Sequence, residues 1–223
     1  MFEHNFVNLP QLKTTDINGR RHYITPEGAV YPSITTVLSA KEPQELKEWK
    51  RIIGEDEAER IALTSAGSGQ AFHDLCEKYL RNTPNYDFGY FPDVMLMFRQ
   101  ALKSINRISN IMAIESPLYS NRLQIAGRCD VIAKYKNLPA IIDFKSNRTE
   151  PMFIENKIEK YFVQCKGYAE MFEERTGVKI NIGVLIVSSV DYGLTTYVDD
   201  LHKYNMSLNQ AIDYYKEIIQ LEN

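Results

Sequence analysis

Residues 123–146, LQIAGRCDVIAKYKNLPAIIDFKS, carry the clearest structural pattern in this chain of 223 residues. They hold two apolar runs, 123–135 and 139–145, and the Lys136-Asn137 pair between them is typical of a tight turn. We therefore predict two neighbouring antiparallel strands. Such a hairpin can return the chain so that Asp130 and Asp143 meet, and Asp143 and Lys145 point to the same face because they are two positions apart.

Further strands and helices are predicted on both sides of this hairpin. Residues 111–119 are expected to form a strand that leads into it through a turn at Asn121-Arg122, and 180–188 a buried strand after it. A helix over about 154–176, ended by Gly177, connects the two regions, and an edge strand (194–198) and a helix (201–221) follow. Upstream, the expected elements are a hairpin at 20–32, a short helix capped by Ser33, a charged helix over 44–64, a helix break at 66–69, and helices at about 70–81 and 93–107.

This order of elements predicts an α/β protein with a mixed central sheet flanked by helices and with a helical N-terminal portion. The length suits one domain, 1–223. We expect it to consist of an N-terminal hairpin and helical cap (1–66), a core (67–200) and a C-terminal helix (201–223).

Composition restricts the classes of protein to which the chain can belong. Its 26 basic and 29 acidic residues give a net charge of −3, which argues against nucleic-acid binding by bulk charge alone. Cys76, Cys129 and Cys165 form no CxxC pair, so neither a zinc site nor a disulfide framework is predicted. This cysteine usage, and the absence of a recognisable signal peptide, transit peptide or apolar membrane span, favour a cytoplasmic protein without a membrane partner. We expect a bacterial or phage-infected cell as its location rather than an organelle.

The charged residues of the hairpin predict a metal site. Two carboxylates on one side of a sheet repel each other unless a cation lies between them, and hard oxygen ligands favour Mg²⁺ or Mn²⁺. A lysine beside them can hold a water molecule or a phosphate and stabilise the attack on phosphorus. Alternatively, Asp130 and Asp143 end their strands and Lys145 is solvated. The triplet at 143–145 follows an apolar run (139–142), however, and a charge at the end of a buried strand is costly without a partner.

Four motifs resemble one nuclease family. GRCD (127–130) and IIDFKS (141–146) resemble the signature of the PD-(D/E)XK nucleases, GQAFH (69–73) the G-x-x-x-H helix of their RecB-like exonuclease branch, and QCKGY (164–168) its Q-x-x-x-Y motif. YPSITTVLSA (31–40) is similar to the N-terminal segment of the mitochondrial genome maintenance exonucleases and their phage relatives. Cys129 departs from the proline of the family pattern. The four cysteines of the iron–sulfur subgroups are absent, so no such cluster is expected.

The resemblance implies a role for each motif residue. His73, Asp130 and Asp143 are expected to bind Mg²⁺ or Mn²⁺ together with the backbone carbonyl of Phe144, while Lys145 orients the attacking water. Alternatively, His73 is an ordinary packed or surface histidine of its helix.

The helix after the lysine strand has its own implied role. Gln164 and Tyr168, four apart on one helical face, are expected to grip the DNA backbone and help to place Lys145. Tyr168 can instead belong to the core. Glu115 can complete the site as an outer-shell or second-metal acid, or simply occupy an edge position or bulge.

A local basic stripe can contact phosphates even when the total charge is slightly negative. About half of the basic residues near the site can equally be ordinary solvated ones. Tyr86, Phe88, Tyr90 and Phe91 on one loop are expected to stack on single-stranded bases and, with the N-terminal helices, to roof the site. The expected DNA-binding residues are Arg128, Lys145, Arg148, Lys157, Lys160, Gln164 and Tyr168, with Lys166, Arg20, Arg21, Lys41, Lys47, Lys50 and Arg51 as further basic candidates.

The sequence therefore predicts a metal-dependent DNA exonuclease that prefers single-stranded ends. It is expected to act as a monomer in replication, repair or recombination, with proteins of those processes as possible partners. The alternatives are a catalytically inactive DNA-binding scaffold on a nuclease fold and a structure-specific endonuclease.

Overall fold

The computed structural model describes residues 1–40, 50–147 and 151–222. Part of the predicted 44–64 helix falls on the remaining positions, as do the DNA-contact candidates Lys41, Lys47 and Arg148. Those predictions therefore lie outside the described residues.

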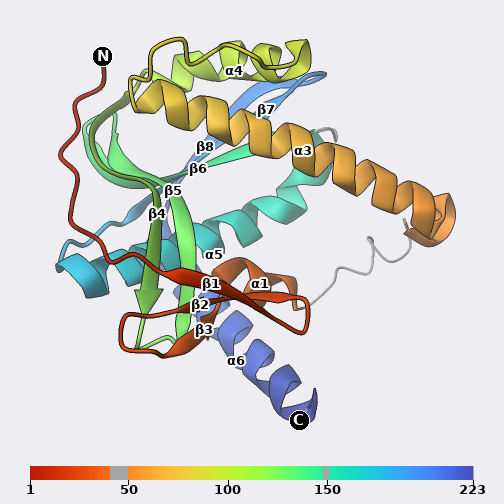
Figure 1. The fold of residues 1–223 in the computed structure, drawn as a ribbon, viewed down its shortest axis with the longest axis vertical. Coiled ribbons are helices and arrows are strands. Elements are labelled where there is room, and N and C mark those ends of the chain that lie inside the picture. Colours follow the sequence, from red (N-terminus) through yellow and green to blue (C-terminus); the bar gives the residue numbers. More distant parts are fainter. Residues whose placement is uncertain (41–49, 148–150, 223) are drawn as a thin grey trace.

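A five-stranded sheet forms the centre of the molecule (Figure 1). Its strands follow in chain order: β4 (Ile108–Ser120), β5 (Ile125–Tyr135), β6 (Leu138–Asn147), β7 (Ile182–Ser189) and β8 (Gly193–Asp200). All neighbours are antiparallel except β6 and β7, which are parallel and are connected by α5 (Pro151–Thr176). This confirms the mixed sheet flanked by helices that the sequence predicted.

The turn between β5 and β6 explains why this hairpin was predictable. Lys136 and Asn137 both have left-handed backbones, with φ of 48° and 70°. Two consecutive left-handed residues make the type I′ turn whose twist matches that of paired strands. The turn sets the register Tyr135↔Leu138 through Val131↔Ile142, which places Asp130 and Asp143 at the next position.

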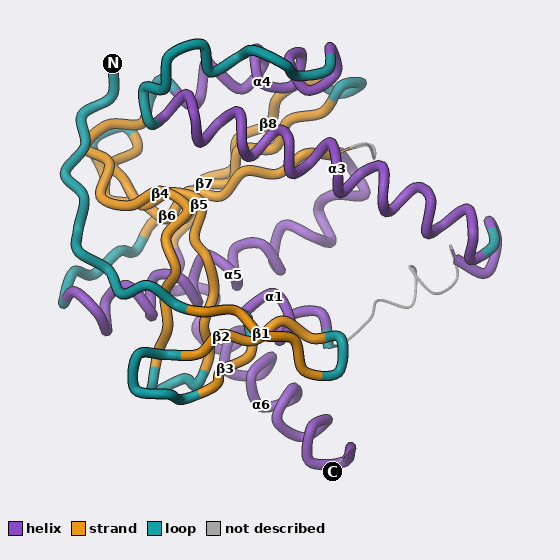
Figure 2. Tube along the Cα trace, viewed as in Figure 1, coloured by secondary structure: helices purple, strands orange, loops and turns teal. Residues whose placement is uncertain are grey.

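Helices cover both faces of the central sheet (Figure 2). On one face α3 (Glu55–Leu80) and α4 (Pro92–Ile105) enclose a core that includes Phe72, Phe98 and Ile186. On the other, α5 packs with α1 (Ile34–Ser39) and α6 (Asn205–Glu222) around a core that includes Ile132 and Phe172. Among the described helices, none is both long and apolar enough to cross a membrane.

The N-terminal part forms a second, three-stranded sheet of β1 (Lys13–Ile17), β2 (Arg20–Ile24) and β3 (Val30–Pro32). The β2–β3 hairpin and the α1 cap were predicted, and the Ser33 hydroxyl accepts the predicted hydrogen bond from the Thr36 amide at 2.9 Å. Strand β1 was not predicted, because its side chains are mostly exposed and show no apolar alternation. The Asn18-Gly19 turn that joins β1 to β2, with φ of 54° and 73°, is the sequence feature that could have predicted this strand.

The predicted helix break at 66–69 is wrong, because α3 continues through it from Glu55 to Leu80. Gly69 packs against β6: a β-carbon added there would lie 2.9 Å from Ser146 Oγ. This glycine therefore allows close contact between helix and strand and does not end the helix. The boundary expected between residues 66 and 67 falls inside α3, whose N-terminal half projects from the body (Figure 1).

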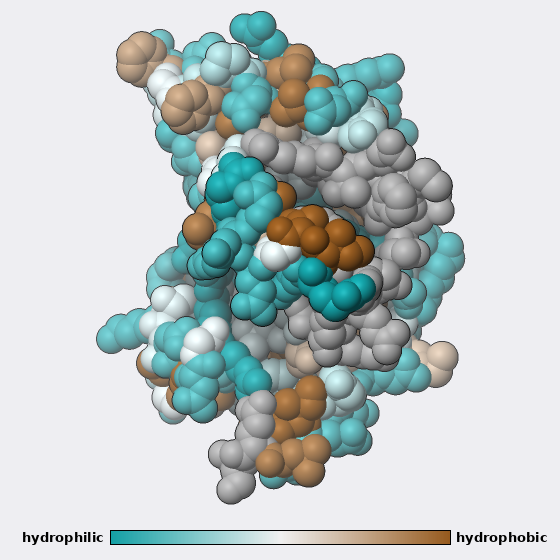
Figure 3. All heavy atoms as spheres, turned by 90° about the vertical axis from the view of Figure 1, so that its right-hand side faces the viewer, coloured by the Kyte–Doolittle hydropathy of each residue, from teal (hydrophilic) through white to brown (hydrophobic). Residues whose placement is uncertain are grey.

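The projecting end of α3 faces the viewer in Figure 3, where hydrophobic patches lie within a largely hydrophilic surface. The exposed large apolar side chains of this part of the chain are Ile52, Ile61 and Leu63.

The last part of the chain differs slightly from the prediction of a single helix over 201–221. A 3-10 turn, η1 (Leu201–Tyr204), precedes α6.

Candidate active site

Three carboxylates occupy one row across the central sheet. Glu115 lies between the pairs Ile114↔Val131 and Ser116↔Cys129, so it faces Asp130. Beyond the pair Val131↔Ile142, the next positions of β5 and β6 are Asp130 and Asp143. Asp130 thus stands between two acidic neighbours, an arrangement that is unfavourable without compensating positive charge.

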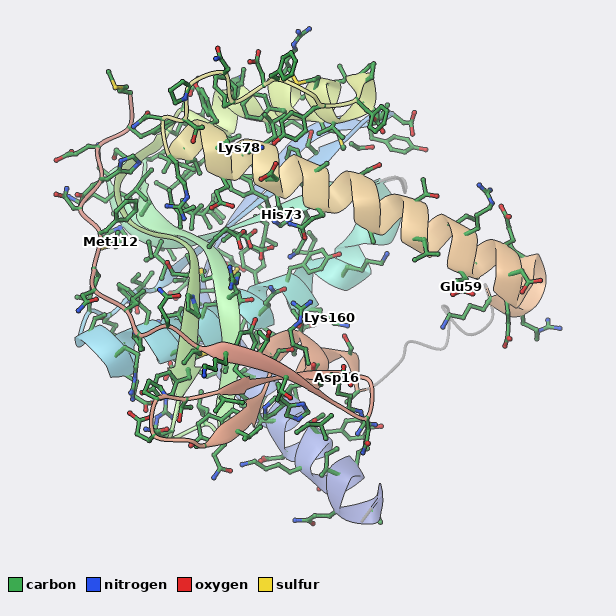
Figure 4. The ribbon with its side chains drawn as sticks, in the orientation of Figure 1. Asp16, Glu59, His73, Lys78, Met112 and Lys160 are labelled. Carbon is green, nitrogen blue, oxygen red and sulfur yellow. The ribbon has the colours of Figure 1, made fainter. Side chains whose placement is uncertain are left out.

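Asp130 is held by contacts from a strand and a helix. Its Oδ2 accepts a hydrogen bond from the Phe144 amide at 2.8 Å and lies 3.2 Å from Nδ1 of His73. His73 is on the side of α3 that faces the strands (Figure 4). The structure therefore places His73, the histidine of the G-x-x-x-H motif, next to Asp130, although the two residues are far apart in the sequence.

Gly69 packs closely against Ser146 of β6 and lies one helical turn before His73. We expect Gly69→Ala to lower the rate of the proposed reaction by up to about threefold, because its β-carbon would lie 2.9 Å from Ser146 Oγ, and any part of this clash that rotation of the hydroxyl does not relieve shifts His73 from Asp130. The matched control is Gly67→Ala, since a β-carbon at Gly67 has open space. Restoration of the rate by Ser146→Ala in the Gly69→Ala protein would confirm the cause, and equal rates for the two alanine variants would contradict it.

Glu115 is placed by an irregular backbone. Its φ of 46° lies in the left-handed region, which is costly for a side chain of this kind. The preceding carbonyl, that of Ile114, accepts hydrogen bonds from Arg81 Nη2 at 3.1 Å and from Ser116 Oγ at 3.0 Å. Glu115 therefore sits at an irregular position of the strand and also lies near Asp130, while its role as an acid of the site stays a prediction. Arg81 had no sequence signal, because its partner is a main-chain oxygen.

Asp143 and Lys145 form a buried ion pair on β6. Lys145 Nζ lies 2.6 Å from Asp143 Oδ2, and only 1% of the Asp143 side chain is exposed. From α5, Gln164 Nε2 donates to Asp143 Oδ1 at 3.3 Å and to Tyr168 Oη at 3.1 Å. Gln164 Oε1 lies 3.5 Å from Lys145 Nζ. Gln164 of the Q-x-x-x-Y motif thus contacts Asp143 and approaches Lys145, and Tyr168 contacts Gln164.

Burial and neighbouring charges shift the pKa values of the three carboxyl groups in different directions. Burial, reinforced by Asp130, raises the pKa of Glu115 to about 7. Burial also raises the pKa of Asp143 to about 6, although Lys145 opposes the shift. Burial would raise the pKa of Asp130 as well, but His73 and Lys145 hold it below its ordinary value. A proton or another cation therefore binds favourably between these carboxylates.

The pKa values of the two basic groups, His73 and Lys145, are raised by the neighbouring carboxylates. Burial would lower the pKa of His73, yet the Asp130 carboxylate raises it above its usual value. Burial would likewise lower the pKa of Lys145, but Asp143 and Asp130 raise it. Lys145 therefore remains an ammonium group at neutral pH and can supply positive charge to an anionic substrate.

The donor atoms fit a divalent metal ion. Ligand atoms of His73, Glu115 and Asp130 all lie within 4.8 Å of one another. Among the described residues, buried Asp143 Oδ2 accepts no hydrogen bond of ordinary geometry despite its nearness to Lys145. The cluster can bind a metal ion, and Glu115 belongs to it on geometric grounds.

The predicted DNA-contact residues fall into two groups. Arg128 and Lys157 are exposed, and Lys160 is partly buried, with a pKa lowered by burial and by Lys157. Lys160 lies across from His73, towards the small sheet (Figure 4). Gln164 and Tyr168 are only 8% and 2% exposed, so they contact the site from behind, and their grip on DNA stays a prediction.

Lys166 does not fit the basic stripe proposed from sequence. Its side chain is buried and forms an ion pair with Glu170, which also binds Arg122. These residues line a separate pocket of about 440 Å³ with Glu173, Glu174, Lys179, His202 and Asn205. Because its side chain is buried and paired with Glu170, Lys166 does not fit the role of a DNA-phosphate contact that the sequence suggested.

The aromatic loop is only partly available for stacking. Phe88 and Phe91 are 88% and 77% exposed. Tyr86 packs against Tyr79 and Phe98, while the Tyr90 hydroxyl is bonded to Asp74 and Lys78. Two of the four rings are therefore exposed and two are packed or hydrogen-bonded, and stacking of the exposed rings on bases stays a prediction.

The fold and the cluster define an α/β protein with a potential metal centre, compatible with an α/β nuclease fold. No family model matches the chain. It is similar to mitochondrial genome maintenance exonuclease 1 of Xenopus tropicalis, with 23% identity over 242 residues that cover 96% of this chain and 67% of that protein. The protein of the same name from Mus musculus is 24% identical over 170 residues, 72% of this chain and 50% of its own length. The chain thus spans about two thirds of one relative and half of the other, and this distant homology supports an exonuclease-like family.

Proposed function

We propose that this protein is a metal-dependent DNA exonuclease whose centre consists of His73, Glu115, Asp130, Asp143 and Lys145. The observation that carries the proposal is the row of three carboxylates with a histidine on one side and a buried lysine on the other. Such a set suits a divalent cation and the negative charge of a phosphodiester. The names of the two relatives support DNA as the substrate.

Each residue has a defined part in this proposal. His73, Glu115, Asp130 and Asp143 would hold Mg²⁺ or Mn²⁺, which when bound supplies charge stabilisation to the phosphate and acidifies water. Phe144 remains a candidate ligand through its carbonyl oxygen. Lys145 holds a water molecule or phosphate oxygen by its ammonium, and Gln164 with Tyr168 fixes Asp143 and the lysine from behind.

We also propose that the substrate is a strand end, with single-stranded DNA preferred. The exposed rings of Phe88 and Phe91 suit stacking on unpaired bases, and Arg128, Lys157 and Lys160 suit phosphates. In this proposal residues 67–200 contain the catalytic core, and the preceding segment and the C-terminal helix accompany it.

Linear and covalently closed single strands of the same sequence distinguish the proposal from its alternatives. An exonuclease shortens the linear strand with Mn²⁺ and leaves the circle intact. Cleavage of the circle would indicate an endonuclease instead. Binding of both without products would indicate an inactive scaffold.

Stabilisation by Mn²⁺ should increase with pH. Because the pKa of Glu115 is raised from 4.5 to about 7 on folding, its protonated form stabilises the fold fully below about pH 4.5, and this contribution is lost as the pH rises through about 7. Asp143, raised to about 6, behaves in the same way. A cation competes with these protons, so Mn²⁺ should raise the melting temperature more at about pH 8 than at about pH 6. Thermal unfolding with Mn²⁺ or EDTA measures this, and a pH-independent shift would contradict it.

A further inference from the structure

We propose that Tyr161 is a positioning residue for Lys145, whose ammonium group its ring holds in place; this inference rests on the proposed function. Lys145 Nζ lies 4.9 Å from the centre of the Tyr161 ring. A cation within about 6 Å of a ring centre is attracted by its electron-rich face, and more strongly when water is excluded. Only 19% of the Lys145 side chain is exposed.

The same face of α5 carries the other groups that approach the lysine. Tyr161, Gln164 and Tyr168 are spaced by three and four positions, which aligns them along one side of a helix. Gln164 contacts both Asp143 and Tyr168 and lies 3.5 Å from Lys145 Nζ. The helix therefore presents an amide and an aromatic ring to the ammonium group.

The ring gives a hold that does not depend on the carboxylate. Asp143 is the nearest partner of Lys145, at 2.6 Å, but it is also a proposed ligand of the metal ion. A second cation on that carboxylate weakens its attraction for the ammonium group. The Gln164 contact is at the outer limit of a hydrogen bond. The uncharged Tyr161 ring then keeps Lys145 in position for the substrate.

The test compares Tyr161→Phe, which keeps the ring, with Tyr161→Leu, which removes it, on linear single-stranded DNA with Mn²⁺. We expect Tyr161→Phe to stay within about twofold of the wild-type kcat and Tyr161→Leu to lose about tenfold. The KM for DNA and the Mn²⁺ concentration for half-maximal rate should change less than about twofold, because Tyr161 touches neither in the proposal. Tyr214→Leu on α6, a partly exposed tyrosine outside the site, is the matched control.

A second readout needs no activity. Melting temperatures in EDTA are measured for Tyr161→Leu, Lys145→Met and the double variant, and Tyr161→Leu should cost less stability when Lys145 is already methionine. An equal loss in both backgrounds, a wild-type kcat for Tyr161→Leu, or a tenfold loss for Tyr161→Phe would each overturn the assignment. If the wild type cleaves no DNA while the coupling persists, the proposed function fails but the contact between ring and lysine stands.

Discussion

Replacement of Asp130 by asparagine should lower the rate of DNA cleavage by about a thousandfold or more, because the central ligand of the proposed metal site loses its charge. The substitution keeps the shape of the side chain and an oxygen that can accept the hydrogen bond from the Phe144 amide. We therefore expect the metal-free fold to survive, with little change in the circular dichroism spectrum. Initial rates on an end-labelled oligonucleotide measure the effect.

The control for this variant is Asp213→Asn, which removes the same charge from an exposed position on α6. It should keep the wild-type rate and the wild-type response to Mn²⁺. Wild-type turnover by Asp130→Asn, or an equal loss in the control, would contradict the assignment of Asp130.

The Glu115→Gln variant is expected to be more stable than the wild type without metal and to lose most of its stabilisation by Mn²⁺. At about pH 8 the wild-type carboxylate is charged beside Asp130, at a cost of about 3 kcal/mol that the neutral amide avoids. The same substitution removes one of the grouped ligand atoms. Urea unfolding in EDTA and thermal unfolding with added Mn²⁺ measure the two effects.

Glu59→Gln tests whether any loss of a glutamate has this effect, since Glu59 lies on the projecting part of α3, away from His73 (Figure 4). Glu59→Gln should change neither the stability without metal nor the stabilisation by Mn²⁺. A metal-free Glu115→Gln protein that is less stable than the wild type, or that responds fully to Mn²⁺, would exclude Glu115 from the site.

The sequence predicted the central hairpin well because its information is local. The turn residues Lys136 and Asn137 determine the register, and the register brings Asp130 to Asp143. The α3 helix was harder, since its course through Gly69 depends on a contact with Ser146 in a distant strand. Two glycines in four residues favour a break only when no tertiary packing compensates for their flexibility.

The parts of the site that depend on packing between distant elements could not be predicted in full. The role of Glu115 stayed open because its left-handed backbone is held by Arg81 from α3. The contact between Tyr161 and Lys145 depends on how α5 docks against β6. Tyr168 is buried in the core, as one interpretation expected, and accepts a hydrogen bond from Gln164, while its role towards DNA stays a prediction. Motifs thus predicted most of the residues that the structure brings together here, and contacts between distant elements brought in Tyr161 and Arg81.

The most direct measurement is the time course of an end-labelled linear single-stranded oligonucleotide incubated with the wild-type protein in EDTA, Mg²⁺ or Mn²⁺. The proposed centre predicts progressive shortening with a divalent metal, no shortening in EDTA, and shortening by Asp130→Asn that is slower by about a thousandfold or more. Shortening in EDTA, or an intact strand with both metals, would contradict the claim that this cluster is a metal-dependent DNA-cleaving site.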